Sequence, residues 1–296
     1  MRCARRGART CTTTGHSRVD EDGAEDGPLD RSFRDRLGKR AGRPAMAPPV
    51  LWQFRFSHFN EKARWALDFK GIPHVRRSLV PGLHVPRVLW LSGQKSLPVL
   101  ELNGETIIDS TRIIATLERL KPDPPLYPRN ERERALALED FFDEELGPYV
   151  RRALFHELLP DGDYCAALFS EGSGSAARMA YRAAFPVIRV LMKLDMKIDA
   201  AGAAKARARV AAALDRLDGE LQPSGYLVGE RFSVADLAAA ALLAPLVFPP
   251  EWPYPLPGPL PARAAALSDA FAAHPGVRWV REMYRRHRGT SAALAA

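Results

Sequence analysis

The sequence predicts a mixed α/β domain followed by an all-helical domain, and three observations carry this prediction. Strand-like and helical segments alternate over residues 50–117 and include a hairpin. A proline cluster, KPDPPLYPRN at residues 121–130, then marks the best domain boundary. Beyond it, segments rich in Ala, Arg, Glu and Leu have helical spacing. With 296 residues and 46% hydrophobic content, the chain can bury sizeable cores.

The first predicted strand is VLWQFRF at residues 50–56, which is rich in residues that favour strands. The sequence SHFN at residues 57–60 leads into EKARWALDFKG, whose apolar residues form one face of a helix. Gly71 ends this helix, and residues 72–79 supply a second strand, with a further helix after it. Arg64 lies near the expected domain junction, where we expect it to pair with an acidic residue of the second domain.

Residues 97–116, LPVLELNGETIIDSTRIIAT, join a hairpin to a helix. The dipeptide Asn103-Gly104 is typical of a type I′ turn between two antiparallel strands. Pro98 fits only the first position of its strand, because proline cannot donate to a ladder. A cis bond there would turn the backbone N–H and C=O of Leu97 out of the sheet, where a peptide can pair with them.

Asp109 and Ser110 precede the buried stripe of the next helix, which contains Ile113, Ile114 and Leu117. The amides of its first turn favour an anionic group, and Ser110 can cap the helix or bond a ligand carboxylate. An ordinary capped helix without a ligand is an equal alternative. The complete order is strand, helix, strand, helix, strand, strand, helix. With a proline opening the third strand, this order predicts a thioredoxin-like domain with a mixed sheet.

The second domain is predicted to be all helical. Ser233 and Asp236 form a capping box, and Phe232 and Leu237 place a hydrophobic staple across the same cap. The apolar run that follows is too short and too broken by proline to span a bilayer. Helices are expected at about residues 131–158, 175–198, 203–222, 233–247, 262–273 and 276–287.

These elements set the expected domain boundaries. Residues 48–122 form the thioredoxin-like domain, residues 130–288 the helical domain and residues 289–296 a flexible tail. Residues 1–45 hold 11 Lys or Arg and 7 Asp or Glu with few aliphatic residues, so we expect a disordered extension. Met46 directly precedes the first domain and is an alternative start of the protein.

Charge and cysteine usage exclude several classes of function. The net charge is +8, but without residues 1–45 there remain 32 basic and 28 acidic residues, a net of +4, which removes the main support for nucleic-acid binding. Cys3, Cys11 and Cys165 have neither disulfide-framework nor metal-ligand spacing, so we expect no metal and a reducing compartment. No apolar segment supports secretion, and an acidic stretch argues against a transit peptide. We expect a cytoplasmic protein with no membrane partner.

Three segments resemble, in the right order, segments of the soluble glutathione transferases. SHFNEKARWALDFKGI resembles the segment that carries a serine or cysteine at the start of the first helix. SLPVLELNGETIIDST resembles the glutathione-binding segment, and GYLVGERFSVADLAAA the signature of the C-terminal domain. The resemblance covers roughly residues 48–288 and implies a serine/cysteine-type glutathione S-transferase, which is commonly a homodimer.

The resemblance makes Ser57 the residue that activates glutathione. A hydroxyl that donates to sulfur at a helix N-terminus lowers the thiol pKa from about 8.5 and increases the thiolate fraction. Serine cannot form the mixed disulfide that thiol exchange requires, so exchange is disfavoured. Alternatively, Ser57 is only the helix cap. His58 stands where many relatives have proline, and Asn60 is the reserve candidate for the thiolate donor or the true cap.

The resemblance also assigns the contacts of glutathione. Asp109 and Ser110 hold its γ-glutamyl end, and the backbone of Leu97, which precedes Pro98, pairs with its cysteinyl unit. Lys95 meets its glycine carboxylate, although a solvated loop lysine explains this residue equally well.

The second substrate is expected to be a small hydrophobic electrophile bound between the domains, where pockets tend to occur. Phe142, Tyr149 and Phe155 are candidate lining residues, although aromatic residues at such spacing are more often core. Two alternatives to a transferase stay open. One is a non-catalytic binding or protein-interaction module with the same fold, and the other is a glutathione-dependent dehalogenase, isomerase or peroxidase.

Overall fold

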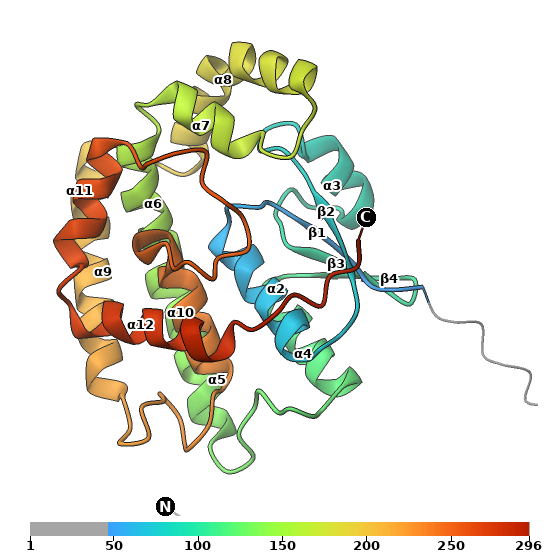
Figure 1. The fold of residues 1–296 in the computed structure, drawn as a ribbon, viewed down its shortest axis with the longest axis vertical. Helices are drawn as coiled ribbons and strands as arrows, with labels where there is room; N and C mark the ends of the chain where they lie inside the picture. Colours follow the sequence, from blue (N-terminus) through green and yellow to red (C-terminus); the bar gives the residue numbers. More distant parts are fainter. Residues whose placement is uncertain (1–46, 296) are drawn as a thin grey trace, which may run out of the picture. The chain divides into compact units, whose positions relative to one another are not determined.

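The structure is a computed structural model that describes residues 47–295. The disorder predicted for residues 1–45 and the alternative start at Met46 lie outside the described residues. From Ala47 onward the chain forms one compact unit. Figure 1 labels its helices and strands.

A four-stranded mixed sheet forms the first half of this unit, with the strand order β2-β1-β3-β4. β1 pairs in parallel with β2 and antiparallel with β3, and β3 pairs antiparallel with β4. Asn103 and Gly104 connect β3 to β4 with φ angles of 56° and 82°, as a type I′ turn requires. The strands are β1 (Val50–Gln53), β2 (Val75–Ser78), β3 (Val99–Leu102) and β4 (Glu105–Ile108).

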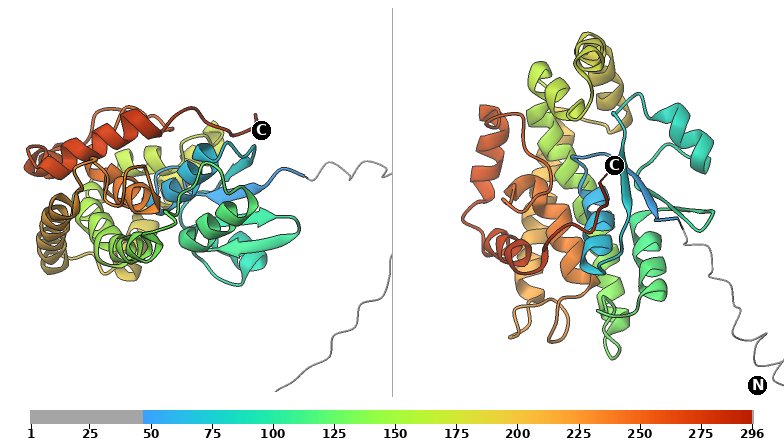
Figure 2. Two further views of the ribbon diagram at one scale, coloured as in Figure 1. Left: turned by 90° about the horizontal axis from the view of Figure 1, so that it is seen from below. Right: turned by 45° about the vertical axis from the view of Figure 1, so that its right-hand side comes forward.

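Three helices accompany the sheet, so the predicted thioredoxin-like arrangement is confirmed. α2 packs against α4, and Figure 2 shows α3 on the opposite side of the sheet from α2. The predicted stripe of α4, Ile113, Ile114 and Leu117, is fully buried. The helices are α2 (His58–Phe69), α3 (Val85–Ser92) and α4 (Ser110–Leu120).

The rest of the unit is helical, as predicted. The helix expected at residues 131–158 is divided by a π-helical turn, and α7 is an additional short helix that follows Pro160. The elements are α5 (Arg132–Phe141), the π-helical turn η1 (Phe142–Leu146), α6 (Gly147–Leu158), α7 (Gly162–Phe169), α8 (Ser175–Asp195), α9 (Ala200–Glu220), α10 (Val234–Val247), α11 (Ala262–Phe271) and α12 (Pro275–His287).

α10 lies at the centre of the helical part, and all of its residues are buried. It packs against α2, α5, α6 and α12, so one helix joins the two halves of the core. A buried ion pair crosses the same junction, because Lys62 Nζ of α2 lies 2.8 Å from Glu139 Oε1 of α5. The domain boundaries at residues 48–122 and 130–288 stay predictions.

The predicted capping box of α10 is present. Asp236 Oδ2 accepts hydrogen bonds from the backbone N–H of Ser233 at 2.8 Å and from its hydroxyl at 2.7 Å. Asp236 Oδ1 accepts from the N–H of Leu227 at 2.8 Å. Burial raises the pKa of Asp236 to about 6. These contacts give Ser233 and Asp236 a structural role.

The flexible tail predicted for residues 289–296 stays a prediction, but residues 289–295 make hydrogen bonds to the thioredoxin-like part. The N–H of Leu294 donates to the carbonyl of His74 at 2.8 Å, directly before the edge strand β2. The N–H of Ala292 donates to Asp68 Oδ1 at 2.8 Å. These hydrogen bonds use backbone groups, so the lack of apolar periodicity in the tail gives no sign of them.

Arg64 does not pair with an acidic residue of the helical part, as the sequence had suggested. Its Nε donates to Glu61 Oε2 at 2.7 Å, within the same helix. Its guanidinium contacts the helical part through aromatic rings, 5.7 Å from the Trp252 centroid and 5.1 Å from the Tyr254 centroid. Arg288, rather than Arg64, makes an ion pair across the junction here, and it bonds Glu61 of the same helix as Arg64.

Candidate functional site

Ser57 is the N-cap of α2. Its backbone is extended, with φ −116° and ψ 126°, and its Oγ accepts a hydrogen bond from the N–H of Asn60 at 3.4 Å. The side chain is half-buried and lines a cavity. Ser57 therefore makes a capping contact and also lines the cavity. The hydroxyl proton is free to point elsewhere, because Oγ acts as the acceptor in the cap.

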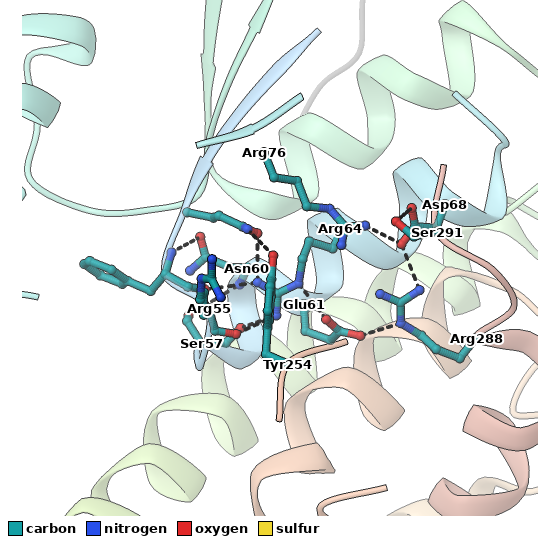
Figure 3. A network of polar contacts seen from close by, with 12 residues as sticks. Arg55, Ser57, Asn60, Glu61, Arg64, Asp68, Arg76, Tyr254, Arg288 and Ser291 are labelled. Carbon is teal, nitrogen blue, oxygen red and sulfur yellow. Dashed lines mark hydrogen bonds and ion pairs between the residues drawn. The ribbon is translucent and has the colours of Figure 1, made fainter. Parts of the chain in front are cut away.

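Arg64 holds the loop that carries Ser57 (Figure 3). Its guanidinium donates to the carbonyls of Phe54 at 3.0 Å, Arg55 at 3.1 Å and Ser57 at 3.5 Å. The side chain is fully buried, so water does not compete for these bonds. One cation thus fixes the backbone of residues 54–57 against α2.

Asn60 connects the same loop to the start of β3. Its Oδ1 accepts from the N–H of Phe54 at 3.3 Å, and its Nδ2 donates to the carbonyl of Leu97 at 3.5 Å. The side chain is fully buried and does not line the cavity. These contacts explain Asn60 as a structural bridge, and they leave Ser57 as the stronger candidate for the thiolate donor.

The cavity beside Ser57 has a volume of about 1040 Å³. One side is formed by residues 54–59, 78–85 and 95–97 of the thioredoxin-like part. The other side is formed by α6, α7, α8 and the segment between α7 and α8. Its apolar lining includes Phe155, Leu168, Phe169, Ile188 and Met192.

The predicted site residues divide into two groups. Ser57, Lys95 and Leu97 line the cavity, whereas Pro98, Asp109 and Ser110 do not. The Leu97–Pro98 bond is cis. Among the aromatic candidates for the second substrate, Phe155 lines the cavity, and Phe142 and Tyr149 do not.

Asp109 is the N-cap of α4. Its Oδ1 accepts from the N–H groups of Thr111 at 2.9 Å and Arg112 at 3.2 Å. Its φ of 76° is unusual for a residue with a side chain and costs on the order of 1 to 3 kcal/mol. Such backbone strain concentrates at functional sites. The buried Ser110 follows as the first residue of the helix.

Lys95 lies at the mouth of the cavity. Its Nζ lies 2.5 Å from Asp195 Oδ1 at the end of α8, and both side chains are more than half exposed. An exposed ion pair of this kind contributes little to stability and exchanges readily with a ligand. The geometry is compatible with both alternatives, a solvated loop lysine and a contact for a carboxylate.

His58 faces the cavity as a neutral ring. Its Nε2 lies 3.0 Å from the carbonyl of Gly147, and because a carbonyl only accepts, Nε2 carries the proton. Burial, together with the nearby charge of Arg151, lowers the pKa of His58 to about 3. The side chain is therefore uncharged at neutral pH and holds the start of α6.

Two charged residues of the cavity had no signal in the sequence. Arg55 forms an ion pair with Glu171 from the segment after α7, and its guanidinium lies 5.0 Å from the Tyr254 ring centroid. Gly172 packs against the same arginine, because a Cβ at this position would lie 2.3 Å from Arg55 Nη2. These contacts join positions more than 100 residues apart, so no local pattern predicts them.

The fold and site agree with the family that matches the chain. Residues 51–125 match the N-terminal domain of glutathione S-transferases, and residues 199–279 match the C-terminal domain of the same family. The two matches together cover more than half of the chain. The chain belongs to the glutathione S-transferase family.

The curated relatives are distant. "Probable maleylacetoacetate isomerase 2" of Drosophila melanogaster is 28% identical over 96 residues, which are 31% of this chain and 42% of that protein. A "Probable glutathione S-transferase" of Solanum tuberosum is 30% identical over 95 residues, 31% of this chain and 43% of that protein. The chain thus spans less than half the length of these two relatives. Another protein of that name, from Nicotiana tabacum, is 24% identical over 66% of this chain and 69% of its own length.

Solved structures share the fold. A glutathione S-transferase from Methylobacillus flagellatus with glutathione bound has a TM-score of 0.53 at 21% identity, covering 81% of this chain and 96% of its own. One from Xanthobacter autotrophicus has a TM-score of 0.55 at 20% identity, covering 82% of this chain and 95% of its own.

Membrane-spanning helices and metal-binding clusters are both absent from the described part of the chain. None of its helices combines the length and apolar character needed to cross a membrane. Residues 47–295 also contain no group of three His, Cys, Asp or Glu side chains that could hold a metal ion.

Proposed function

We propose that the protein is a glutathione S-transferase in which Ser57 stabilises the thiolate of bound glutathione for attack on a small electrophile. The observation that carries this proposal is the position of Ser57. It caps α2 and lines a cavity of about 1040 Å³ that is also lined by Leu97 and Lys95. A thiolate beside a helix N-terminus is favoured by the helix dipole and by a donated hydroxyl proton.

Glutathione would lie along the thioredoxin-like side of the cavity. The backbone of Leu97, before Pro98, would pair with the cysteinyl unit, and Lys95 would meet the glycine carboxylate. Asp109 and Ser110 would hold the γ-glutamyl end at the start of α4. Since they lie outside the cavity itself, this end extends beyond it, and the strained backbone of Asp109 supports a role for that turn.

The electrophile would bind against the apolar wall of α6, α7 and α8. Attack by the thiolate forms a carbon–sulfur bond and either displaces a leaving group with its electron pair or adds to an activated double bond, which then takes up a proton. The proposal includes a homodimer. It also includes a cytoplasmic location.

A titration of the bound thiol tests this function. The ultraviolet absorbance of the glutathione thiolate should titrate well below the free thiol pKa of about 8.5 when the protein is present. Ser57→Ala should raise this pKa and reduce turnover of aryl halides, epoxides, enones and hydroperoxides in parallel. Glutathione affinity, measured by calorimetry, should change little because the hydroxyl acts on the sulfur.

Ser173→Ala is the matched control, because Ser173 also lines the cavity but on the opposite side, next to Gly172. This variant should keep the thiol titration of the unmodified protein. Full activity in Ser57→Ala combined with a loss in Asn60→Ala would show that the donor is Asn60.

A non-catalytic glutathione-binding module is the second candidate function. The capping contact that Ser57 Oγ accepts from Asn60 favours it, since this contact gives Ser57 a role without catalysis. Glutathione binding with an unshifted thiol pKa would support this candidate. Absence of binding up to several millimolar glutathione would exclude both.

A further inference from the structure

Arg151 is an unpaired cation in the wall of the cavity. It comes from α6, lines the cavity and is half-buried. Within residues 47–295 its guanidinium has no hydrogen bond or ion pair, and its only acidic influence is the charge of Asp195. Burial lowers the pKa of Arg151 the most, while the charge of Asp195 raises this pKa and the charge of Arg152 lowers it. An arginine stays charged all the same.

The other cations around the cavity differ from Arg151. Arg55 is paired with Glu171, and Lys95 is paired with Asp195. Arg76 is paired with Asp68. The two acids of the cavity wall, Glu171 and Asp195, are therefore both engaged by other cations.

Arg77 is the remaining arginine of the cavity lining, and no ion pair of it is present in the described part of the chain. It differs from Arg151 because its side chain is exposed, on the edge strand β2. Water solvates an exposed guanidinium fully, whereas a half-buried one has lost part of its hydration, and a partner of opposite charge offsets that loss. Arg151 is therefore the position at which the cavity favours an anion.

The surroundings of Arg151 define the ligand further. His58 beside it is neutral and adds no competing charge. Leu154 and Phe155, one turn further along α6, line the same cavity, and Leu168 and Met192 line it from α7 and α8. A guanidinium within an apolar wall matches a ligand with one anionic group on an apolar body.

We propose that the second substrate is an apolar electrophile that carries a carboxylate or a similar anionic group, and that Arg151 binds this group. The proposal rests on the proposed function, because the ligand is a substrate only if the protein is a transferase. Arg151 is a binding residue for the electrophile and not for glutathione, because the predicted contacts of glutathione lie on the thioredoxin-like side, between Lys95 and Ser110.

Equilibrium binding of two related dyes tests the proposal without any need for catalysis. 8-Anilinonaphthalene-1-sulfonate and N-phenyl-1-naphthylamine share the same ring system, but only the first carries an anionic group. We expect Arg151→Met to weaken binding of the anionic dye by about tenfold to a hundredfold, as loss of a charged hydrogen-bond partner does. Binding of the neutral dye should stay within about twofold, since its apolar contacts are kept. The affinity for dodecanoate, measured by displacement of a dye, should fall in Arg151→Met as the affinity for the anionic dye does. The affinity for dodecanol, which is uncharged, should not depend on Arg151.

Arg152→Met is the matched control. Arg152 is the next residue of α6 but does not line the cavity, and its Nε donates to the carbonyl of Met196 at 3.3 Å. This variant should leave both dyes unaffected. Arg151→Lys keeps the charge but loses the planar fork, so its affinity for the anionic dye should lie between those of the unmodified protein and Arg151→Met.

Three outcomes would overturn the proposal. One is an equal loss of affinity for both dyes in Arg151→Met. Another is a loss of affinity for the anionic dye in Arg152→Met that is as large as in Arg151→Met. The third is a loss of glutathione affinity in Arg151→Met, which would assign this arginine to the glutathione site. Failure of the proposed function is a separate result, because it would appear as absence of glutathione binding while the dyes still distinguish Arg151→Met.

Discussion

Arg288, the residue after α12, donates from Nε to Glu61 Oε1 in α2 at 2.6 Å, and both side chains are buried. Glu61 also accepts from Arg64, which holds the carbonyls of the loop that ends at Ser57. Figure 3 shows this connection from the end of the helical part to the start of α2. The position of the candidate catalytic serine thus depends on a contact more than 200 residues away along the chain.

Arg288→Met should strongly destabilise the fold. Arg288 also donates from Nη1 to Asp68 Oδ2 at 2.8 Å, so the substitution leaves two buried carboxylates without this partner. Removal of one member of a buried ion pair costs on the order of 3 to 5 kcal/mol of the free energy of unfolding. Urea unfolding measures this change.

Arg285→Met provides the comparison within the same chain end. Arg285 pairs with Glu282 on the exposed face of α12, where solvent screens the attraction, so its loss should change stability little. Equal effects of the two substitutions would contradict the importance that the structure gives to the Arg288–Glu61 pair.

The features that the sequence predicted correctly are those that depend on neighbouring residues. The type I′ turn requires only Asn103-Gly104, and the capping box requires only Ser233 and Asp236, three residues apart. The burial of α4 follows in the same way from its apolar spacing.

The features that the sequence did not predict depend on contacts between distant segments. The sequence suggested an inter-domain ion pair for Arg64, but Arg64 pairs with Glu61, one helical turn away. Arg288 is the residue that reaches Glu61 across the junction. Arg151 and Glu171 reach the cavity from elements whose placement only the fold determines. Ser57 and Lys95 became candidates through a family resemblance, and Leu97 through both the adjacent Pro98 and that resemblance.

Cys165 should be inert toward thiol reagents in the folded protein. It is fully buried, its Sγ lies 3.1 Å from the carbonyl of Leu158, and burial raises the pKa of its thiol to about 12. Since the thiolate is the reactive form, alkylation requires unfolding. In a full-length Cys3→Ser, Cys11→Ser variant, iodoacetamide should label no residue at pH 8 and one residue in urea, as mass spectrometry would report. Rapid labelling without urea would be inconsistent with this burial.

Asp236 should make the fold less stable as the pH rises from about 4 to about 6. Burial raises the pKa of Asp236 to about 6 in the folded protein, above the value of about 3.9 in an unfolded chain. Between these two pH values the folded protein retains a proton that the unfolded chain has lost. The contribution of this group to the free energy of unfolding therefore falls with pH, by at most about 1.4 kcal/mol per pH unit.

Comparison with Asp236→Asn isolates this effect. The contribution of Asp68 to the free energy of unfolding changes with pH in the opposite direction. Burial raises the pKa of Asp68, but its ion pairs with Arg288 and Arg76 outweigh burial and hold this pKa below its ordinary value. The pH dependence of the unmodified protein contains both contributions. The difference in unfolding free energy between the unmodified protein and Asp236→Asn should decrease from pH 4 to pH 6 and be constant above pH 7. A difference that does not vary with pH would show that Asp236 titrates near its ordinary pKa.

Gly147→Ala should disturb the junction between α2 and α6. A Cβ at Gly147 would lie 2.6 Å from Phe59 Cζ and 3.2 Å from Leu242 Cδ2, so the added methyl group has no room. Overpacking of this kind costs about 1 to 3 kcal/mol. The carbonyl of Gly147 also accepts the hydrogen bond from His58, so the displacement reaches the residue next to Ser57.

Gly219→Ala is the control, because Gly219 lies on the exposed side of α9 with no atom within 4 Å of the added Cβ. There the same substitution should stabilise the protein by about 0.5 to 1 kcal/mol, since alanine favours the helix. Urea unfolding of both variants measures the contrast, and a neutral Gly147→Ala would mean that Phe59 has space to move aside.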